Sequence, residues 1–157
     1  MKQITSTAEL GQAQAIRHQV FVEEQGIPAE LEYDGADLSA IHVLAYQGED
    51  AVATGRLLLE PDGVGVLGRI AVIGPVRGQG IGGQVVRQLE QCAVAAGVQR
   101  LILHPHAYLE KFYTALGYQT IAGGESTVGA HRLLLMEKQL AMTNDDKKVN
   151  SYVTCRQ

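Results

Sequence analysis

Cysteine is scarce in this chain, which contains only Cys92 and Cys155. Two cysteines cannot build a disulfide framework, and these two lack the paired spacings of a structural zinc site. Long apolar runs are absent too, because none approaches the roughly 20 residues that a membrane helix needs. The N-terminal segment lacks the basic-then-apolar pattern of a secretory signal. We therefore expect a cytoplasmic protein that has no metal and does not bind membranes.

Basic residues are fewer than acidic residues in this chain. Lys and Arg number 13 against 17 Asp and Glu, for a net charge of -4. This balance argues against a nucleic-acid partner, which would require clustered basic residues. No Lys or Arg lies between His18 and Gly55, a stretch that contains the acidic residues Glu23 to Asp50. This acidic segment predicts a surface that favours a cation, whereas the basic excess from Arg69 to Lys111 favours an anion.

The length of 157 residues and a hydrophobic content of 46% predict one globular domain. We place that domain at residues 1–140 and expect the polar residues 141–157 to form a flexible tail. A short strand at 2–5 precedes a helix whose apolar residues recur every three or four positions from Ala8 to Val20. Thr7 is its expected N-cap, and the helix must stop before Pro28.

The middle of the chain predicts strands followed by a βαβ unit. Turn residues separate three expected strands at 41–46, 51–59 and 64–72, which predicts antiparallel hairpins. A glycine-rich loop, a helix ending at Gly97 and an apolar strand at 101–103 come next. We expect the last elements to be a helix at 107–116 and strands at 118–122 and 131–137. The fold class is α/β, with a mixed, mostly antiparallel sheet flanked by helices.

Three interpretations compete for the loop at 77–83. Gly78, Gly80 and Gly83 satisfy the dinucleotide pattern G-x-G-x-x-G. However, a dinucleotide fold normally places this pattern in its first βα turn, with an acidic residue about 20 positions later, and neither feature is present. No Lys follows the loop as in an ATP-binding P-loop. The third pattern, R-x-x-G-x-G, is filled by Arg77, Gly80 and Gly82 between an apolar strand and an amphipathic helix.

With this third pattern the chain resembles the GNAT superfamily of acyl-CoA-dependent N-acetyltransferases. The stretch Arg69-Ile70-Ala71-Val72 before the loop, and Phe112-Tyr113 and Leu116-Gly117-Tyr118 after it, keep the order and spacing of that family. The resemblance covers about Gln3 to Leu140. The segment from Arg17 to Gln25 and that from Asp37 to His42 resemble the ElaA-like branch. The implied structure is a single-domain GNAT fold.

The resemblance implies that acetyl-CoA is bound as co-substrate. Glycines let a backbone approach a pyrophosphate closely, and a helix N-terminus adds free N–H groups and a favourable dipole. The loop residues expected to hold the pyrophosphate are Arg77, Gly78, Gln79, Gly80, Ile81, Gly82 and Gly83. On the preceding strand, Ile70, Ala71 and Val72 would lie along the pantetheine, with the backbone of Ile70 and Val72 pairing with it. We expect His106 to make a polar contact to the pantetheine or to the substrate, and Phe112 to pack in the core beside the cofactor.

The same resemblance assigns catalytic roles. Tyr113 is the expected general acid, because a phenol stays protonated at neutral pH and can donate to a thiolate. His131 is the expected base, since histidine changes charge near neutral pH. A backbone N–H at or beside Val72 would stabilise the oxyanion. Glu23 and Glu24 are alternatives for the base, acting directly or through a water molecule. The residues assigned to the acceptor are Glu23, Glu24 and His42.

Several alternatives stay open. A non-catalytic acyl-CoA-binding module shares every feature of the glycine loop, and a dinucleotide oxidoreductase remains a third hypothesis. Arg69 either orients the substrate or pairs with the acidic segment. The acceptor is a small-molecule or peptide amine, with a cationic amine favoured by the acidic segment. Dimers are common in the superfamily, which leaves a homodimer open.

Overall fold

The computed structural model describes residues 1–140, so the expected tail at 141–157 and Cys155 lie outside the described range. The helices are α1 (Thr7–Arg17), the π-helix η1 (His18–Glu24), α2 (Ala29–Glu32), α3 (Ile81–Ala95) and α4 (Glu110–Ala115), with 3-10 turns η2 (Asp37–Ser39), η3 (Pro61–Gly63), η4 (Gly74–Val76) and η5 (Ala107–Leu109). The strands are β1 (Lys2–Gln3), β2 (Ile41–Gln47), β3 (Asp50–Glu60), β4 (Val64–Val72), β5 (Arg100–Leu103), β6 (Gln119–Thr120), β7 (Ser126–Val128), β8 (His131–Leu133) and β9 (Met136–Gln139).

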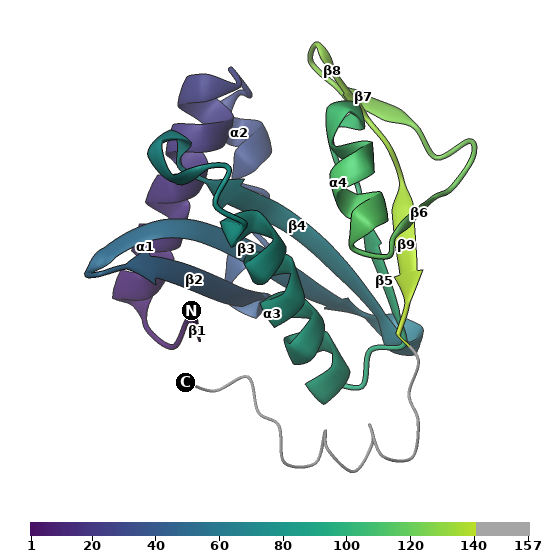
Figure 1. Cartoon of the computed structure of the whole chain (residues 1–157), viewed down its shortest axis with the longest axis horizontal. Coiled ribbons are helices and arrows are strands. Elements are labelled where there is room, and N and C mark those ends of the chain that lie inside the picture. The colour runs from purple at the N-terminus through teal and green to yellow at the C-terminus, as the bar shows by residue number, and fades with distance from the viewer. Residues whose placement is uncertain (141–157) are drawn as a thin grey trace.

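Seven strands form one mixed sheet in the order β1-β2-β3-β4-β5-β9-β6 (Figure 1). Every neighbouring pair is antiparallel except β4 and β5, which are the parallel strands of the β4–α3–β5 unit. The expected fold class, the hairpins and the βαβ unit are confirmed. Within residues 1–140, no helix has the length and apolar character needed to cross a membrane.

Helices cover both faces of the sheet, because successive residues of a strand point to opposite sides. On β2, Val43 belongs to the apolar core beneath α3, while the next residue, Leu44, packs with Ala13 and Ile16 of α1. Cys92 lies on the buried stripe of α3, as the helical pattern predicts. The acidic loop with α2 and η2 follows η1, on the α1 side of the sheet (Figure 1).

Strand β4 contains a β-bulge at Arg69, close to the point where β4 and β5 separate. Arg56 of β3 pairs with Gly68, but Thr54 pairs with Ala71, so β4 contains one residue more than β3 over this stretch. Arg69 takes up the extra residue with a positive φ of 53°. The parallel pairing of β4 with β5 ends at Leu67 and Leu103. Beyond this point the two strands separate, and Figure 1 shows them meeting near the lower right and diverging upward.

Three local predictions are corrected. The N-cap of α1 is Ser6 rather than Thr7, because the Ser6 hydroxyl accepts a hydrogen bond from the Glu9 N–H. The strand expected at 131–137 is two strands, β8 and β9. β8 pairs with β7, a strand that was not predicted, in a separate two-stranded ribbon. The chain changes partners between them, at Leu134, whose N–H donates to the carbonyl of Pro105.

Candidate active site

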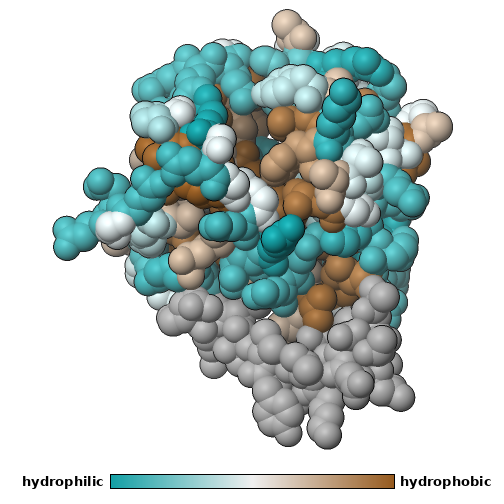
Figure 2. Space-filling view, viewed as in Figure 1, coloured by the Kyte–Doolittle hydropathy of each residue, from teal (hydrophilic) through white to brown (hydrophobic). Residues whose placement is uncertain are grey.

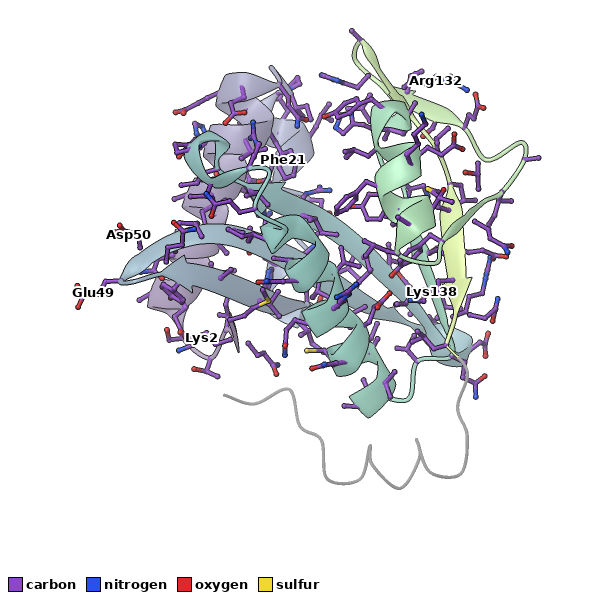
Figure 3. The ribbon with its side chains drawn as sticks, viewed as in Figure 1. Lys2, Phe21, Glu49, Asp50, Arg132 and Lys138 are labelled. Atoms are coloured by element: carbon purple, nitrogen blue, oxygen red, sulfur yellow. The ribbon has the colours of Figure 1, made fainter. Side chains whose placement is uncertain are left out.

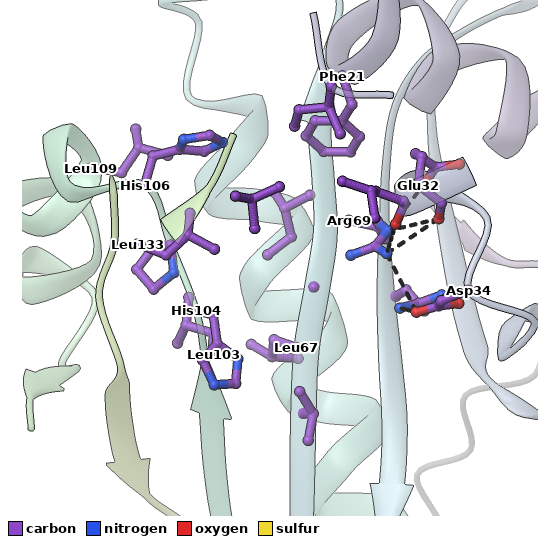
Figure 4. A pocket seen from close by; sticks show the side chains of 18 of the residues that line it. Phe21, Glu32, Asp34, Leu67, Arg69, Leu103, His104, His106, Leu109 and Leu133 are labelled. Carbon is purple, nitrogen blue, oxygen red and sulfur yellow. Dashed lines mark hydrogen bonds and ion pairs between the residues drawn. The ribbon is translucent and has the colours of Figure 1, made fainter. Parts of the chain in front are cut away.

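A cavity of about 640 Å³ opens where β4 and β5 separate. Most of its lining is apolar and comes from η1, α2, β4, β5 and the β7–β8 ribbon. In Figure 2 brown hydrophobic atoms show in the hollow between the part of the molecule that carries α1 and α2 and the part that carries α4. Phe21 extends from η1 toward this space in Figure 3 and forms one end of it in Figure 4. The volume suits a small-molecule site.

The glycine loop leaves the first turn of α3 open. Gly78 and Gly80 have φ values of 82° and 80°, a conformation that other residues rarely adopt. A Cβ atom on either would enter open space, so the loop leaves a clear surface above α3. The first helical hydrogen bond runs from Gln84 N to Gly80 O at 3.2 Å. The N–H groups of 81–83 therefore lack helical acceptors and can bind a pyrophosphate.

Strand β4 directs main-chain groups away from β3 between the cavity and this loop. Ile73 N donates to Val52 O of β3 at 3.0 Å. Because main-chain groups alternate in direction along a strand, those of Ile70 and Val72 point away from β3, where the carbonyl of Val72 accepts a hydrogen bond from Arg77 Nε. They face the gap that β5 has left. This arrangement fits an extended pantetheine arm, whose amides could pair with β4 as an added strand.

The side chain of Arg77 connects the glycine loop to β4 and to η1. Its Nε donates to Val72 O at 2.8 Å and its Nη2 lies 2.7 Å from Glu24 Oε2. Glu24 is thus engaged by the loop. Glu23 is more exposed and contacts His18, with 3.5 Å between Oε1 and Nδ1. Neither glutamate lines the cavity.

Tyr113 lines the cavity from α4 and is otherwise buried. Its ring lies edge-on to Phe112 and Tyr118, at centroid distances of 4.9 and 5.9 Å. Burial raises the pKa of Tyr113 well above its usual value, so the phenol remains protonated at neutral pH. No residue within 1–140 hydrogen-bonds its hydroxyl. Phe112 is not a core residue, because 37% of it is exposed, and its ring lies beside Gly82 in the first turn of α3.

Two histidines adjoin the cavity from the C-terminal part. His106 lines it, and burial, followed by the proximity of His131, lowers the pKa of His106. The two rings meet edge to face with centroids 4.9 Å apart. His131 does not line the cavity, and its Nε2 lies 2.9 Å from the carbonyl of Gln25. Of the two rings, the imidazole of His106 is therefore the one that can present a basic nitrogen to the cavity, with His131 packed against it.

The opposite wall belongs to an arginine–carboxylate cluster in which Arg17, Glu32 and Arg56 are buried. Its other members are Asp34, Asp37 and Arg69. Arg17 Nε lies 2.5 Å from Glu32 Oε1, and its Nη1 lies 2.9 Å from Asp37 Oδ1. Arg56 binds Asp34 with two nitrogens, at 2.9 and 2.7 Å. Three arginines thus neutralise three carboxylates. Arg17 is held inside this cluster and does not line the cavity.

This pairing removes much of the negative charge that the acidic segment suggested. Glu32, Asp34 and Asp37 are matched by arginines, and Glu49 and Asp50 lie at the β2–β3 turn, far from the cavity in Figure 3. His42 belongs beneath the cluster and not to the cavity, with its Nε2 2.8 Å from Asp37 O. Burial lowers the pKa of His42.

Some of the residues that the sequence predicts for the site line the cavity, and others lie elsewhere. Ile70, His106 and Tyr113 line the cavity, while Ala71 is buried toward α1 and Gln79 bonds Gln47 at the loop surface. Sequence reasoning did not assign a site role to Phe21, Glu32, Asp34, Arg56 and His104, all of which line the cavity. The lone Arg56 within an apolar strand was an available signal, because a buried charge requires partners. In residues 1–140, no group of three potential ligands could hold a metal ion.

Comparisons with known proteins agree with this geometry. Residues 9–118 match the acetyltransferase (GNAT) family model. YjcF of Bacillus subtilis, an uncharacterized N-acetyltransferase, is 36% identical over 117 residues, which cover 74% of this chain and 83% of YjcF. The crystal structure of Escherichia coli ElaA superimposes with a TM-score of 0.76 at 27% identity, covering 86% of this chain and 93% of ElaA. A Pseudomonas aeruginosa acyl-CoA N-acyltransferase shares the fold, with a TM-score of 0.77 at 23% identity, covering 88% and 99%. The chain belongs to the GNAT acetyltransferase family.

Proposed function

We propose that the protein transfers the acetyl group of acetyl-CoA directly to a primary amine. The observation that carries this proposal is the course of β4, which passes the cavity at Gly68 to Ile70 and then enters the glycine loop after Val72. A bound donor could therefore place its pyrophosphate on the loop and its thioester in the cavity. No other part of the described chain combines an anion-binding helix start with an adjoining cavity of this size.

The donor is held mainly by the main chain. The N–H groups of Ile81, Gly82 and Gly83 bind the pyrophosphate, with the dipole of α3 adding to the attraction. The backbone of Ile70 and Val72 orders the pantetheine arm, and an N–H at this edge of β4 stabilises the oxyanion that forms when the amine attacks. Phe112 covers the first turn of α3 beside Gly82.

Tyr113 serves as the general acid. When the amine nitrogen bonds to the carbonyl carbon, the carbon–sulfur bond breaks and the sulfur leaves as a thiolate. Tyr113 donates its phenolic proton to that sulfur, because the hydroxyl is protonated and lacks a competing acceptor within residues 1–140. The apolar surroundings of Tyr113 also keep water away from the thioester.

His106 removes the proton from the amine, and His131 acts as its positioning residue. The sequence favours His131 as the base, but His106 is the histidine that lines the cavity. A lowered pKa keeps His106 neutral at pH 7 and able to accept a proton. The contact of His131 with Gln25 O fixes the second ring against the first.

Ligand-induced thermal shifts with CoA, acetyl-CoA, NAD and ATP test the donor assignment. Selective binding to the native state raises the melting temperature by mass action. We expect a rise with CoA and acetyl-CoA alone. A rise with NAD and none with either CoA species would overturn the assignment of the glycine loop.

A further inference from the structure

Arg69 presents an unused hydrogen-bonding edge to the cavity. Its Nε donates to Glu32 O at 3.3 Å, and its Nη2 contacts Glu32 O at 3.2 Å and Asp34 Oδ2 at 3.3 Å. Its Nη1 has no partner within residues 1–140, and 26% of the side chain is exposed. Figure 4 shows the bonded nitrogens on the side of Glu32 and Asp34, with the guanidinium at the cavity wall. The free edge is therefore available to a ligand.

The carboxylates behind Arg69 are not available in the same way. The side chain of Glu32 is 1% exposed, with one oxygen on Arg17 and the other enclosed by protein. Both oxygens of Asp34 are bound by Arg56. A molecule in the cavity thus meets the unpaired Nη1 of Arg69 on this wall, whereas the carboxylate of Asp34, although 37% exposed, is already ion-paired with Arg56. Such a wall favours an anionic group over a cationic one.

The guanidinium is also held in place before any ligand arrives. Arg69 sits at the bulge of β4 with its left-handed backbone, and its side chain is tied to the main chain of Leu31 and Glu32. A side chain ordered in advance loses little conformational freedom on binding. A single free nitrogen in an otherwise neutral cluster suits a monoanion, and a planar guanidinium suits a carboxylate.

The remaining walls are apolar, among them Phe21, Leu31, Leu58, Leu109 and Leu133. We propose that the acceptor is an amino acid, a primary amine that also carries a carboxylate and an apolar body, and that Arg69 Nη1 binds this carboxylate. The inference rests on the proposed acetyl transfer. It replaces the cationic acceptor favoured by the acidic segment, whose carboxylates near the cavity are already paired.

Matched acceptors test the inference on the unmodified protein. Acetyl transfer from acetyl-CoA is measured with leucine, leucinamide and 3-methylbutylamine, which share the apolar body and differ in the carboxylate. Because a charge-assisted hydrogen bond is lost without the carboxylate, we expect kcat/KM to be about 10- to 100-fold higher for leucine. Leucinamide has the less basic amine and hence more of the reactive neutral form, so a preference for leucine cannot come from amine reactivity.

The possible outcomes distinguish a failure of this inference from a failure of the proposed acetyl transfer. Transfer to all three amines with equal or better use of leucinamide would overturn the carboxylate site and leave the acetyltransferase proposal standing. Binding of CoA with no transfer to any of a broad amine panel would overturn both. Preference for leucine would support both.

A variant pair assigns the preference to Arg69. Arg69→Gln should lower kcat/KM for leucine about tenfold or more and change that for leucinamide little, which removes the preference. Arg100→Gln is the matched control, because Arg100 is also ion-paired, to Glu137, but lies at the opposite end of β5. A folded Arg69→Gln protein, shown by an unchanged circular dichroism spectrum, that keeps the preference would refute the role of Arg69. If Arg69→Gln does not fold, the comparison of kcat/KM for the three amines with the unmodified protein still tests whether the acceptor needs a carboxylate.

Discussion

The imidazole rings of His106 and His131 meet edge to face, with centroids 4.9 Å apart and planes inclined by 82°. Only the first of them lines the cavity. In the proposed mechanism the two histidines therefore have different roles, because a base must reach the proton that it removes. It also makes the roles separable by experiment.

His106→Asn should lower kcat by about 10²- to 10⁴-fold, the usual contribution of a general base. His131→Asn should cost less, because it removes a neighbour and not the base. For the unmodified protein, kcat/KM should rise with pH through a value below 6.5, since burial lowers the pKa of His106. Initial rates of the original protein and both variants, measured from pH 5 to 9, would give the losses in kcat and the pH dependence of kcat/KM. A larger loss in His131→Asn, with an intact pH profile in His106→Asn, would reverse the assignment.

Tyr113→Phe should keep CoA binding and lose turnover. The substitution removes the hydroxyl and retains the ring that contacts Phe112 and Tyr118, so the fold should be unaffected. We expect kcat to fall about 10²-fold or more, with a CoA dissociation constant within about twofold of the original. Tyr108→Phe, on an exposed tyrosine, is the control. Full activity in Tyr113→Phe would remove Tyr113 from the mechanism.

Gly80→Glu should abolish CoA binding. It places a negative charge and a Cβ atom in the open space above α3, where the pyrophosphate would lie. Gly97→Glu is the matched control, because Gly97 has nearly the same φ, 83° against 80°, and also faces open space, at the other end of the same helix. Both variants bear the strain of a side chain at positive φ. Titration calorimetry with CoA should show binding by Gly97→Glu alone; equal binding by both would locate the donor elsewhere.

Arg17→Met should destabilise the fold strongly. Arg17 is fully buried, and its loss leaves Glu32 without its closest cation. Breaking a buried ion pair costs about 3–5 kcal/mol. Arg100→Met breaks the more exposed pair with Glu137 and should cost no more than about 1 kcal/mol. Urea denaturation compares the two free energies of unfolding, and similar losses would show that the buried cluster adds little to stability.

The free energy of unfolding should decrease as the pH falls. Burial lowers the pKa of His42 in the folded state, so the unfolded chain takes up protons first as the pH falls through 6.5. Burial opposes ionisation of Asp37, but hydrogen bonds from Arg17 and Gln14 outweigh it and lower the pKa of Asp37 to about 2. Its contribution, complete above pH 4, is lost between about pH 4 and pH 2. Urea titrations should show two losses, and His42→Gln should reduce the one near pH 6, to which His106 also contributes because burial lowers its pKa as well; a flat profile in the original protein would contradict this.

Local sequence patterns were sufficient to predict the hairpins, the glycine loop and the β4–α3–β5 unit. Turn residues mark the ends of β2, β3 and β4, and the residues that form the loop are consecutive. The site depends on long-range pairing, which one sequence does not reveal. The acidic segment suggested a cation-binding surface, because its partners Arg17, Arg56 and Arg69 lie outside it in the chain.

The position of His131 also depends on long-range pairing. The sequence predicts one continuous strand at 131–137, but the chain changes from β8 to β9 at Leu134, whose N–H donates to the carbonyl of Pro105. His131 lies on β8 and does not line the cavity, whereas His106 does. The bulge at Arg69 is likewise set by pairing with β3 and not by any turn residue in β4.

The most direct test of the account is the mass balance of the reaction with acetyl-CoA and an amine panel that includes leucine. Free thiol is measured with a chromogenic disulfide, and the N-acetylated amine by mass spectrometry. The account predicts one N-acetylated amine for each CoA released, and a loss of both products in Tyr113→Phe. Tight CoA binding with no N-acetylated product from any amine would show a binding module in place of an acetyltransferase.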